Sequence, residues 1–310
     1  TSRWPAWQVL LDSSLSRDGR MIDRSQDDQR STSEGQSYAL FFALVANDQA
    51  LFDRILAWTQ DNLAGGDMRQ RLPAWLWGRD AKGGWQVLDS NPASDSDLWL
   101  AYALLEGARL WRRPALQAIA EGMLQQVRAR EIVQLPELGP MLLPGPQGFV
   151  EGDATRINPS YLPLPLLRRF ASVDRKGPWP ALAANTVRML QQSSPHGFAP
   201  DWTAWQAGGF VADPVKGAVG SYDAIRCYTW ASMTAPRDPL FRPQLAALSG
   251  PLQRLRSGAA MWEKIDTRSG QGQGEGNYGF RAALLPYLLA QGENERARAL
   301  QALSLIHISE

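Results

Sequence analysis

The chain has 310 residues, and its 32 Lys and Arg against 31 Asp and Glu leave a formal net charge of +1. This balance argues against nucleic acid or an anionic membrane as a partner, and no apolar run is long enough to predict a membrane span. Cys227 is the only cysteine, which excludes an internal disulfide and a cysteine zinc site, and we expect it to be a small buried thiol. The chain has only two histidines. Proton transfer is therefore expected to rely on Asp and Glu, and neither a metal nor a cofactor is predicted.

Helical periodicity dominates the chain, and alternating strand patterns are scarce. After a short helix near residues 4–15, the sequence predicts helices at 33–46, 48–63, 95–111, 114–131, 159–172, 178–192, 221–233, 239–256, 278–291 and 293–306. They form successive pairs, separated by long Gly- and Pro-rich loops at 65–94, 132–158, 193–220 and 257–277. Simple helical bundles have short connections, so loops of this length indicate a different fold. We expect these loops to be functional and to cluster on one face of it.

The two members of each helix pair begin differently. Second members begin with ordinary helix-start residues, such as Pro114 and Pro239. First members begin with polar and aromatic groups, namely Glu34 with Tyr38, Asp95 with Trp99, Asn158 with Tyr161, Tyr222 with Asp223, and Asn277 with Tyr278. The difference predicts an inner and an outer ring of helices, an all-α (α/α) toroid whose inner N-termini line a cleft. Acidic and aromatic groups in a cleft suit a carbohydrate substrate.

Each acidic residue at these helix starts also has a structural interpretation. The Ser-Thr-Ser-Glu segment ending at Glu34 fits a capping box, and a proton donor there would need burial or neighbouring carboxylates to keep it neutral. Asp95 and Asp97 suit a helix cap and the helix dipole, and for Asp97 we prefer this interpretation. Asp223 lies three residues before Arg226, which predicts an intrahelical ion pair. The same pairing suits a general base, which must stay ionised.

Tryptophan is unusually frequent, with 13 residues. Trp75, Trp77 and Trp85 lie in a predicted loop, where stacking on sugar rings explains indoles better than core packing does. Trp202 and Trp205 have the same interpretation. These residues predict aromatic contacts to a saccharide.

Several motifs together resemble glycoside hydrolase family 8, and they extend over nearly the whole chain. They are Thr-Ser-Glu-Gly-Gln-Ser-Tyr at 32–38, Arg-Leu-Pro-Ala-Trp-Leu-Trp-Gly at 71–78, Leu-Asp-Ser-Asn at 88–91, Asn-Pro-Ser-Tyr-Leu-Pro at 158–163 and Ser-Tyr-Asp-Ala-Ile-Arg at 221–226. The resemblance implies an (α/α)6 barrel that hydrolyses β-1,4-glucan with inversion at the anomeric carbon. It places the proton donor on Glu34, the general base on Asp223, and on Asp95 the aspartate that holds the sugar at the cleavage subsite.

Further substrate contacts implied by the resemblance fall on Trp75, Trp77, Trp85, Tyr161, Tyr222 and Arg226. Asn158 and Trp202 are also expected to bind the substrate. Ser96 replaces a glycine of the family's Ser-Asp-Gly-Asp motif. Inversion implies donor and base carboxyl groups about 6.5–9.5 Å apart, which leaves room for a water molecule. The resemblance also implies a periplasmic or secreted location and a functional association with the cellulose synthase machinery.

The helix pattern contains one pair fewer than a closed ring of six pairs. Residues 304–310 resemble a non-native tail, so we expect a single catalytic domain at 1–303 and a native chain that continues beyond it. Two other functions stay open at this point. One is a relative on the same fold that cleaves xylan or chitosan, and the other is a non-catalytic glucan-binding accessory protein.

Overall fold

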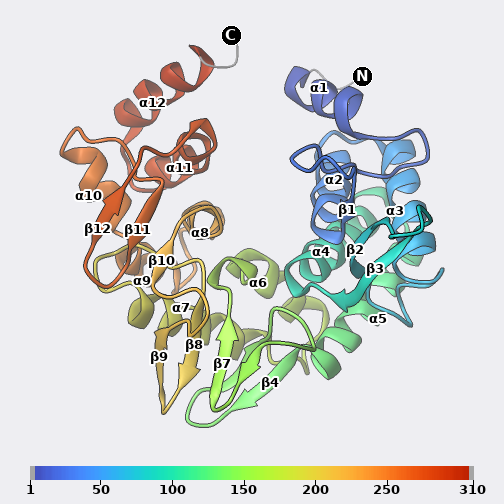
Figure 1. Cartoon of the computed structure of the whole chain (residues 1–310), viewed down its shortest axis with the longest axis horizontal. Helices are drawn as coiled ribbons and strands as arrows, with labels where there is room; N and C mark the ends of the chain where they lie inside the picture. Colours follow the sequence, from blue (N-terminus) through green and yellow to red (C-terminus); the bar gives the residue numbers. More distant parts are fainter. Residues whose placement is uncertain (1–3, 307–310) are drawn as a thin grey trace. The chain divides into compact units, whose positions relative to one another are not determined.

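The computed structural model describes residues 4–306, which form two compact units (Figure 1). Among the described residues, the first unit comprises 4–132 with Pro144–Gln147, and the second comprises Val133–Leu143 with 148–306. Within 4–306, every helix is too short or too polar to cross a membrane. Residues 307–310, part of the expected non-native tail, lie outside the described residues.

The helices of the first unit follow the predicted pairs. They are α1 (Pro5–Ser14), α2 (Ser33–Val45), α3 (Gln49–Leu63), α4 (Ser94–Trp111) and α5 (Pro114–Arg130). Helix α2 packs on α3 and α4 packs on α5, while the first members α2 and α4 also pack against each other. Most residues of α4 are buried, whereas α5 buries a single stripe. In the α4–α5 pair, the first member is thus more buried than the second.

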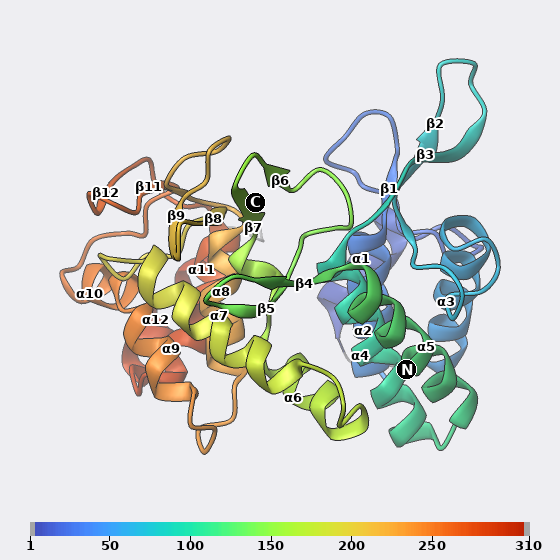
Figure 2. The same ribbon diagram turned by 90° about the horizontal axis from the view of Figure 1, so that it is seen from below.

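A small antiparallel sheet determines where α2 begins. Its strands β1 (Ser31–Thr32), β2 (Ala74–Arg79) and β3 (Trp85–Pro92) follow the order β1-β2-β3, and Ser31 pairs with Trp77. Strand β1 leads directly into α2, so the sheet positions the first turn that carries Glu34. The predicted loop 65–94 thus contains a hairpin, which extends from its helices in Figure 2. The hairpin was not predicted from the sequence, because most of β3 is exposed and its residues do not alternate between buried and exposed.

The second unit contains the remaining helices. They are the 3₁₀ turn η1 (Pro159–Tyr161), α6 (Leu164–Val173), α7 (Trp179–Ser193), α8 (Ala224–Met233), α9 (Phe241–Ala247), α10 (Gly250–Arg256), α11 (Tyr278–Ala290) and α12 (Asn294–Ile306). Helix α8 packs on α6 and α11, and the pairs α6–α7 and α11–α12 pack internally. The helix predicted at 239–256 is two helices, because Gly250 bonds back to Gly197 and begins a new turn before Pro251. Pro163 similarly separates η1 from α6.

Short strands occupy the other predicted loops. They are β4 (Ile132–Leu135), β5 (Gly139–Leu142), β6 (Val150–Glu151), β7 (Ala154–Ile157), β8 (Thr203–Gln206), β9 (Gly209–Ala212), β10 (Val219–Gly220), β11 (Lys264–Asp266) and β12 (Gln271–Gln273). Strands β6-β7-β8-β9 form one antiparallel sheet and β10-β11-β12 another. The expectation of an all-α chain is corrected accordingly, since the fold is mainly helical with small sheets. These strands place the segments before η1 and before α8.

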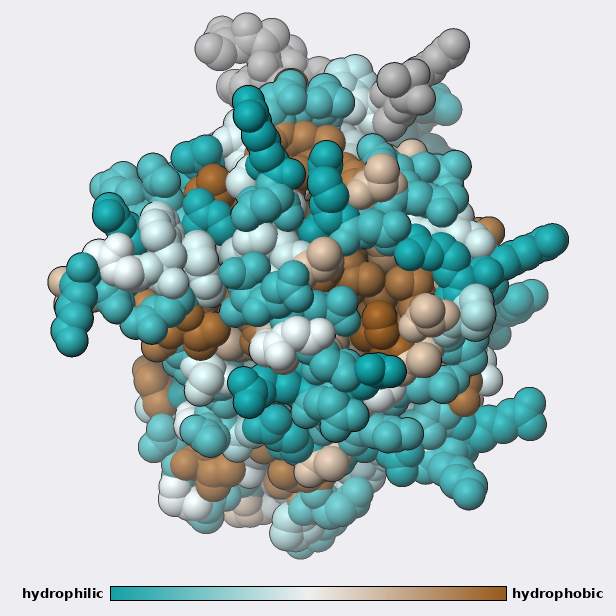
Figure 3. All heavy atoms as spheres, turned by 90° about the vertical axis from the view of Figure 1, so that its right-hand side faces the viewer, coloured by the Kyte–Doolittle hydropathy of each residue, from teal (hydrophilic) through white to brown (hydrophobic). Residues whose placement is uncertain are grey.

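The face drawn in Figure 3 is largely hydrophilic, and its apolar side chains lie in separate patches between polar ones. Exposed large apolar residues such as Val9, Val45 and Leu110 are spread over different helices. The interior instead holds the large rings, including the fully buried Trp179 and Tyr228. Part of the high tryptophan content therefore belongs to the core.

Candidate active site

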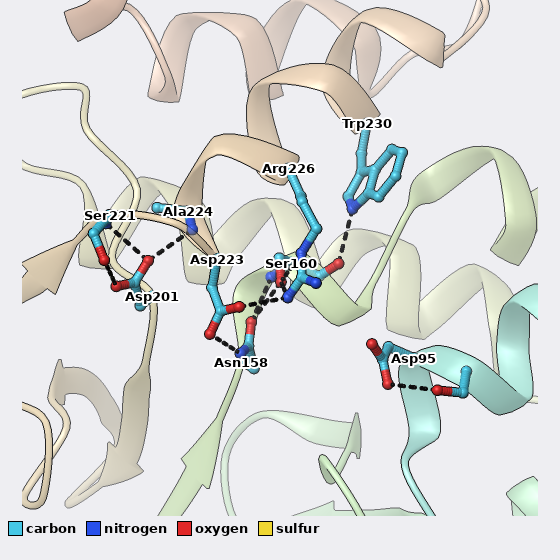
Figure 4. Close-up of polar contacts among 10 residues, drawn as sticks. Asp95, Asn158, Ser160, Asp201, Ser221, Asp223, Ala224, Arg226 and Trp230 are labelled. Carbon is cyan, nitrogen blue, oxygen red and sulfur yellow. Dashed lines mark hydrogen bonds and ion pairs between the residues drawn. The ribbon is translucent and has the colours of Figure 1, made fainter. Parts of the chain in front are cut away.

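The carboxylate of Asp223, beside the start of α8, is held by a closed ring of hydrogen bonds (Figure 4). Asn158 Nδ2 donates to its Oδ2 at 3.1 Å, and Arg226 Nη2 donates to its Oδ1 at 2.7 Å. The Arg226 guanidinium also donates to Ser160 Oγ at 2.8 and 3.1 Å, and that hydroxyl donates to Asn158 Oδ1 at 2.7 Å. The predicted ion pair of Asp223 with Arg226 is confirmed, and it forms one side of this ring.

The chain builds this ring from buried and well-paired polar groups. Asn158 follows β7 and caps η1, where its Oδ1 accepts the backbone N–H of Ser160 at 3.0 Å. Asn158 and Ser160 are 1% and 3% exposed, and Trp230 Nε1 donates to the Ser160 carbonyl at 2.8 Å. The Asp223 side chain, by contrast, is 36% exposed. A carboxylate that is fixed by two donors and still reaches solvent is suited to take a proton from water.

Aromatic side chains lie beside this ring in the second unit. The Arg226 guanidinium is 5.8 Å from the ring centroid of Tyr161, and the rings of Tyr161 and Trp202 are 6.3 Å apart. Trp202 is stacked on Phe149 with centroids 5.9 Å apart, and the guanidinium of Arg156 lies 5.0 Å from its centroid. The structure thus brings Tyr161, Trp202 and Arg226 together, and Phe149 and Arg156 also contact the Trp202 ring.

Two other aromatic expectations have different outcomes. Tyr222 is 49% exposed, and its hydroxyl donates to Glu263 Oε1 at 2.7 Å, so the ring is held at the surface next to Asp223. Trp205 is only 4% exposed and packs edge-on against Phe210 at 4.9 Å. The expectation that Trp205 stacks on sugar is therefore wrong, because the indole belongs to the core.

Glu34 lies in the first turn of α2 and does not form the predicted capping box. The N-cap residue is Thr32, whose Oγ1 accepts the Gly35 N–H at 3.1 Å. A capping box needs the glutamate at the third helical position, which Gly35 occupies, whereas Glu34 is the second. The capping-box interpretation of Glu34 is wrong for this reason.

Gln36 anchors the same turn and is a residue that the sequence did not indicate. Its side chain is fully buried, its Nε2 donates to Gly19 O at 3.2 Å and to Thr59 Oγ1 at 2.9 Å, and its Oε1 accepts the Met21 N–H at 2.5 Å. These bonds tie the start of α2 to α3 and to the segment before β1. The only signal was its place in the Ser-Glu-Gly-Gln motif.

Asp95 and Asp97 lie in the first turns of α4, whose N-cap residue Ala93 makes no side-chain cap bond. Asp95 is 4% exposed, and its Oδ1 accepts the Ser96 hydroxyl at 3.3 Å (Figure 4). Asp97 lies in the first turn of α4, where we expect it to complement the helix dipole, and it is fully buried. Burial first, and then the neighbouring carboxyl group of Glu131, raises the pKa of Asp97 well above its usual range.

The tryptophans of the β2–β3 hairpin form a cluster with an arginine. Trp77 and Trp85 stack with centroids 5.0 Å apart and planes 16° apart, and the Arg20 guanidinium is 5.0 and 4.9 Å from the two centroids. Trp58 packs edge-on against Trp77 at 5.3 Å. Trp85 is 42% exposed, whereas Trp75 and Trp77 are partly buried. Trp85 is thus the most accessible ring of the three.

Comparison with known proteins identifies the family of this chain. The sequence model of the glycosyl hydrolases family 8 matches residues 1–302. The chain belongs to glycosyl hydrolases family 8. An endoglucanase of Xanthomonas axonopodis pv. citri (strain 306) is 57% identical over 290 residues, which cover 94% of this chain and 76% of that protein. An endoglucanase of Escherichia coli (strain K12) is 43% identical over 299 residues, covering 96% and 80%.

A solved structure extends this similarity to three dimensions. The crystal structure of endo-1,4-D-glucanase from Vibrio fischeri ES114 matches with a TM-score of 0.89 at 38% identity, covering 97% of this chain and 90% of that one. The present chain therefore shares the fold of that structure.

Sequence reasoning missed other polar groups of this family 8 chain. Ser160 lies in the quoted Asn-Pro-Ser-Tyr motif, but nothing local marked its hydroxyl as the link between Asn158 and Arg226. Asp201 had no sequence signal, although its carboxylate contacts the segment that carries Asp223. Cys227 is buried as expected, and burial raises the pKa of its thiol. Among residues 4–306, no group of three or more His, Cys, Asp or Glu side chains is arranged to hold a metal ion.

Proposed function

We propose that this family 8 chain is an endo-β-1,4-glucanase that hydrolyses β-1,4-glucan with inversion at the anomeric carbon, and that Asp223 is its general base. The hydrogen-bond ring around Asp223 carries this proposal. Asn158 and Arg226 donate to its two oxygens, which fixes the orientation of the carboxylate. Its exposed fraction of 36% leaves room for a water molecule to approach. These are the requirements for a group that deprotonates the attacking water.

Glu34 is the proposed general acid, which protonates the leaving glycosidic oxygen. Two observations support this role. Thr32 caps α2, so the helix does not need Glu34 as a capping-box partner. Gln36 and β1 fix the backbone of the same turn, which would hold a catalytic side chain in a defined place.

Asp95 is the proposed residue that holds the sugar at the cleavage subsite. It is 4% exposed and lies one turn before Trp99, which is packed in the core against Tyr38 and Phe41. A rigid helix start of this kind can hold a carboxylate toward sugar hydroxyl groups without reorganisation. The proposed aromatic contacts to the glucan are Trp75, Trp77, Trp85, Tyr161, Trp202 and Tyr222, with polar contacts from Asn158 and Arg226.

The remaining proposals concern the setting of the enzyme. Relatives named endoglucanase, at 57% and 43% identity, support β-1,4-glucan as the substrate. For residues 1–303 we propose a single catalytic domain of the (α/α)6 toroid class, supported by the packing of first members against each other, α2 on α4 and α8 on α11. A periplasmic or secreted location and an association with cellulose synthesis are part of the same proposal.

The decisive experiment combines kinetics with product stereochemistry. Glu34→Gln and Asp223→Asn should each lower kcat on cellohexaose by about 10²–10⁴-fold, while calorimetric binding of the oligosaccharide is retained. Glu121→Gln, an exposed glutamate on α5, is the matched control and should behave like the wild type. NMR of fresh products should show the α-anomer first, because inversion converts a β-linkage into an α-hydroxyl group.

Each component of the proposal has its own contrary result. Unchanged turnover in Glu34→Gln or Asp223→Asn would remove that residue from the mechanism. A newly formed β-anomer would contradict inversion. Binding of cellohexaose without cleavage by the wild type would identify a non-catalytic glucan-binding protein, and faster cleavage of xylan or chitosan would change the substrate class.

A further inference from the structure

The first turn of α8 is capped in an unusual way. A helix N-terminus leaves backbone N–H groups that need acceptors, and the side chain at the N-cap position usually supplies one. In α8 this position is occupied by Asp223, a residue type well suited to capping, yet it makes no side-chain cap bond. Its carboxylate instead accepts from Asn158 and Arg226. Another group must therefore satisfy the start of the helix.

Asp201 supplies the missing acceptor from a distant part of the chain (Figure 4). Its Oδ1 accepts the backbone N–H of Ala224 at 2.7 Å and that of Ser221 at 2.8 Å, and its Oδ2 accepts the Ser221 hydroxyl. The Asp201 N–H in turn donates to the Val219 carbonyl at 2.8 Å. These bonds hold the backbone on both sides of Asp223.

We propose that Asp201 is a positioning residue for the reaction, which caps α8 in place of Asp223 and so leaves the Asp223 carboxylate available as the general base. The inference rests on the proposed role of Asp223. If Asp223 capped its own helix, its oxygens would point to backbone N–H groups and could not bond Asn158 and Arg226 in the same way. The division of the two tasks between Asp201 and Asp223 therefore determines where the base points.

The Asp201 carboxylate loses hydration where it lies, and specific hydrogen bonds offset this loss. The side chain is largely buried, and burial is the main reason that its pKa lies above the ordinary value. The bonds from Ser221 and Ala224 act in the opposite direction, and the nearby charge of Asp223 adds to the effect of burial. A buried carboxylate beside a second carboxylate is retained only where its hydrogen bonds offset the loss of hydration.

The chemistry of the site distinguishes two substitutions. Asp201→Asn keeps an oxygen that can accept both backbone N–H groups, so the start of α8 should stay in place. Its amide would then donate to Ser221 Oγ, which must turn its own proton elsewhere. Asp201→Ala removes every acceptor, and the first turn can then recruit the Asp223 carboxylate as its cap.

The test compares kcat and KM on cellohexaose for Asp201→Ala, Asp201→Asn and a matched cap variant. The control is Asp48→Ala, which removes the acceptor for Leu51 N–H at the start of α3 in the first unit. Asp201→Ala should lower kcat by about 10–100-fold with KM changed less than about threefold, because a small misplacement of a catalytic group affects mainly the chemical step. Asp201→Asn should recover activity to within about threefold of the wild type. Asp48→Ala should lower the unfolding midpoint without changing kcat.

Several results would overturn the inference. Wild-type kcat in folded Asp201→Ala would show that Asp201 is only a structural cap. Equal losses in folded Asp201→Asn and Asp201→Ala would show that the charge, and not the cap, is what matters. If Asp201→Ala does not fold, Ser221→Ala removes only the hydroxyl bond and should lower kcat by a few-fold, and no change there contradicts the inference.

Failure of the proposed function is recognised separately. Full activity of Asp223→Asn would reject Asp223 as the base, whatever Asp201 does. An inactive Asp223→Asn together with a fully active Asp201→Ala would leave the proposed function in place and reject only the positioning role of Asp201.

Discussion

Replacing Glu131 by glutamine should make the chain more stable at alkaline pH. Glu131 follows the last turn of α5, and Asp97 lies near the start of α4, which packs on α5. Both side chains are fully buried, and within residues 4–306 the oxygens of the two carboxyl groups have no hydrogen-bond partner at ordinary geometry. Burial raises the pKa of Glu131 to about 8 from an ordinary 4.5; hydrogen bonding with Asp97 opposes the rise, the charge of Asp95 adds to it, and the charge of Arg130 opposes it. A proton shared by the pair supplies the bond that two carboxylates lack.

The sign and size of the effect follow from proton linkage. A folded chain that holds these protons more tightly than the unfolded chain loses stability as pH rises. The contribution of Glu131 is fully present below about pH 4.5 and is lost as pH rises through about 8. That interval of about 3.5 pH units, at about 1.4 kcal/mol per unit, gives an upper bound on the order of 5 kcal/mol in the free energy of unfolding.

Urea unfolding at pH 5, 7 and 9 measures this contribution directly. Between pH 5 and 8, the stability of Glu131→Gln should fall less steeply than that of the wild type, by up to about 1.4 kcal/mol per pH unit. Glu121→Gln, an exposed glutamate on the same helix, should follow the wild type at every pH. Identical pH slopes for the wild type and Glu131→Gln would refute the reasoning, because the buried carboxyl group would then not titrate as described.

Other substitutions test the packing and the aromatic surface. Tyr228→Phe should lower the free energy of unfolding by about 1–3 kcal/mol, because the Ala199 N–H donates to the Tyr228 hydroxyl at 3.1 Å and would be left buried without an acceptor; an unchanged urea midpoint would contradict this. Gly19→Ala should lower the thermal midpoint, because Gly19 has a φ of 102° and a Cβ there would collide with the Arg54 carbonyl group; a stable variant would show that the backbone can shift. Trp85→Ala should raise KM for cello-oligosaccharides about 3–10-fold with little change in kcat, since an aromatic contact contributes about 0.5–1.5 kcal/mol; an unchanged KM would remove Trp85 from the binding surface.

The helices could be predicted from the sequence because their signals are local. The apolar period that predicted 33–46 and 114–131 corresponds to α2 and α5 within a residue or two, and Pro114 begins α5 as expected. The strands were not predicted, because their partners lie far away in the chain and most strands are very short. Ser31 pairs with Trp77, and Ile157 pairs with Thr203. No window of sequence contains both members of such a pair.

The site residues also divide into those placed by local sequence and those placed by contacts between distant segments. By itself the sequence determined that Asp223 and Arg226 share one helical face, since a spacing of three residues places both side chains together in any helix. Only the tertiary structure decided that Asn158 and Ser160, 65 and 66 residues from their partners Asp223 and Arg226, complete the ring, and that Asp201 caps α8. It also decided that Asp97 is buried. Helix periodicity depends on neighbours along the chain, whereas burial and contacts between distant segments depend on the path of the whole chain.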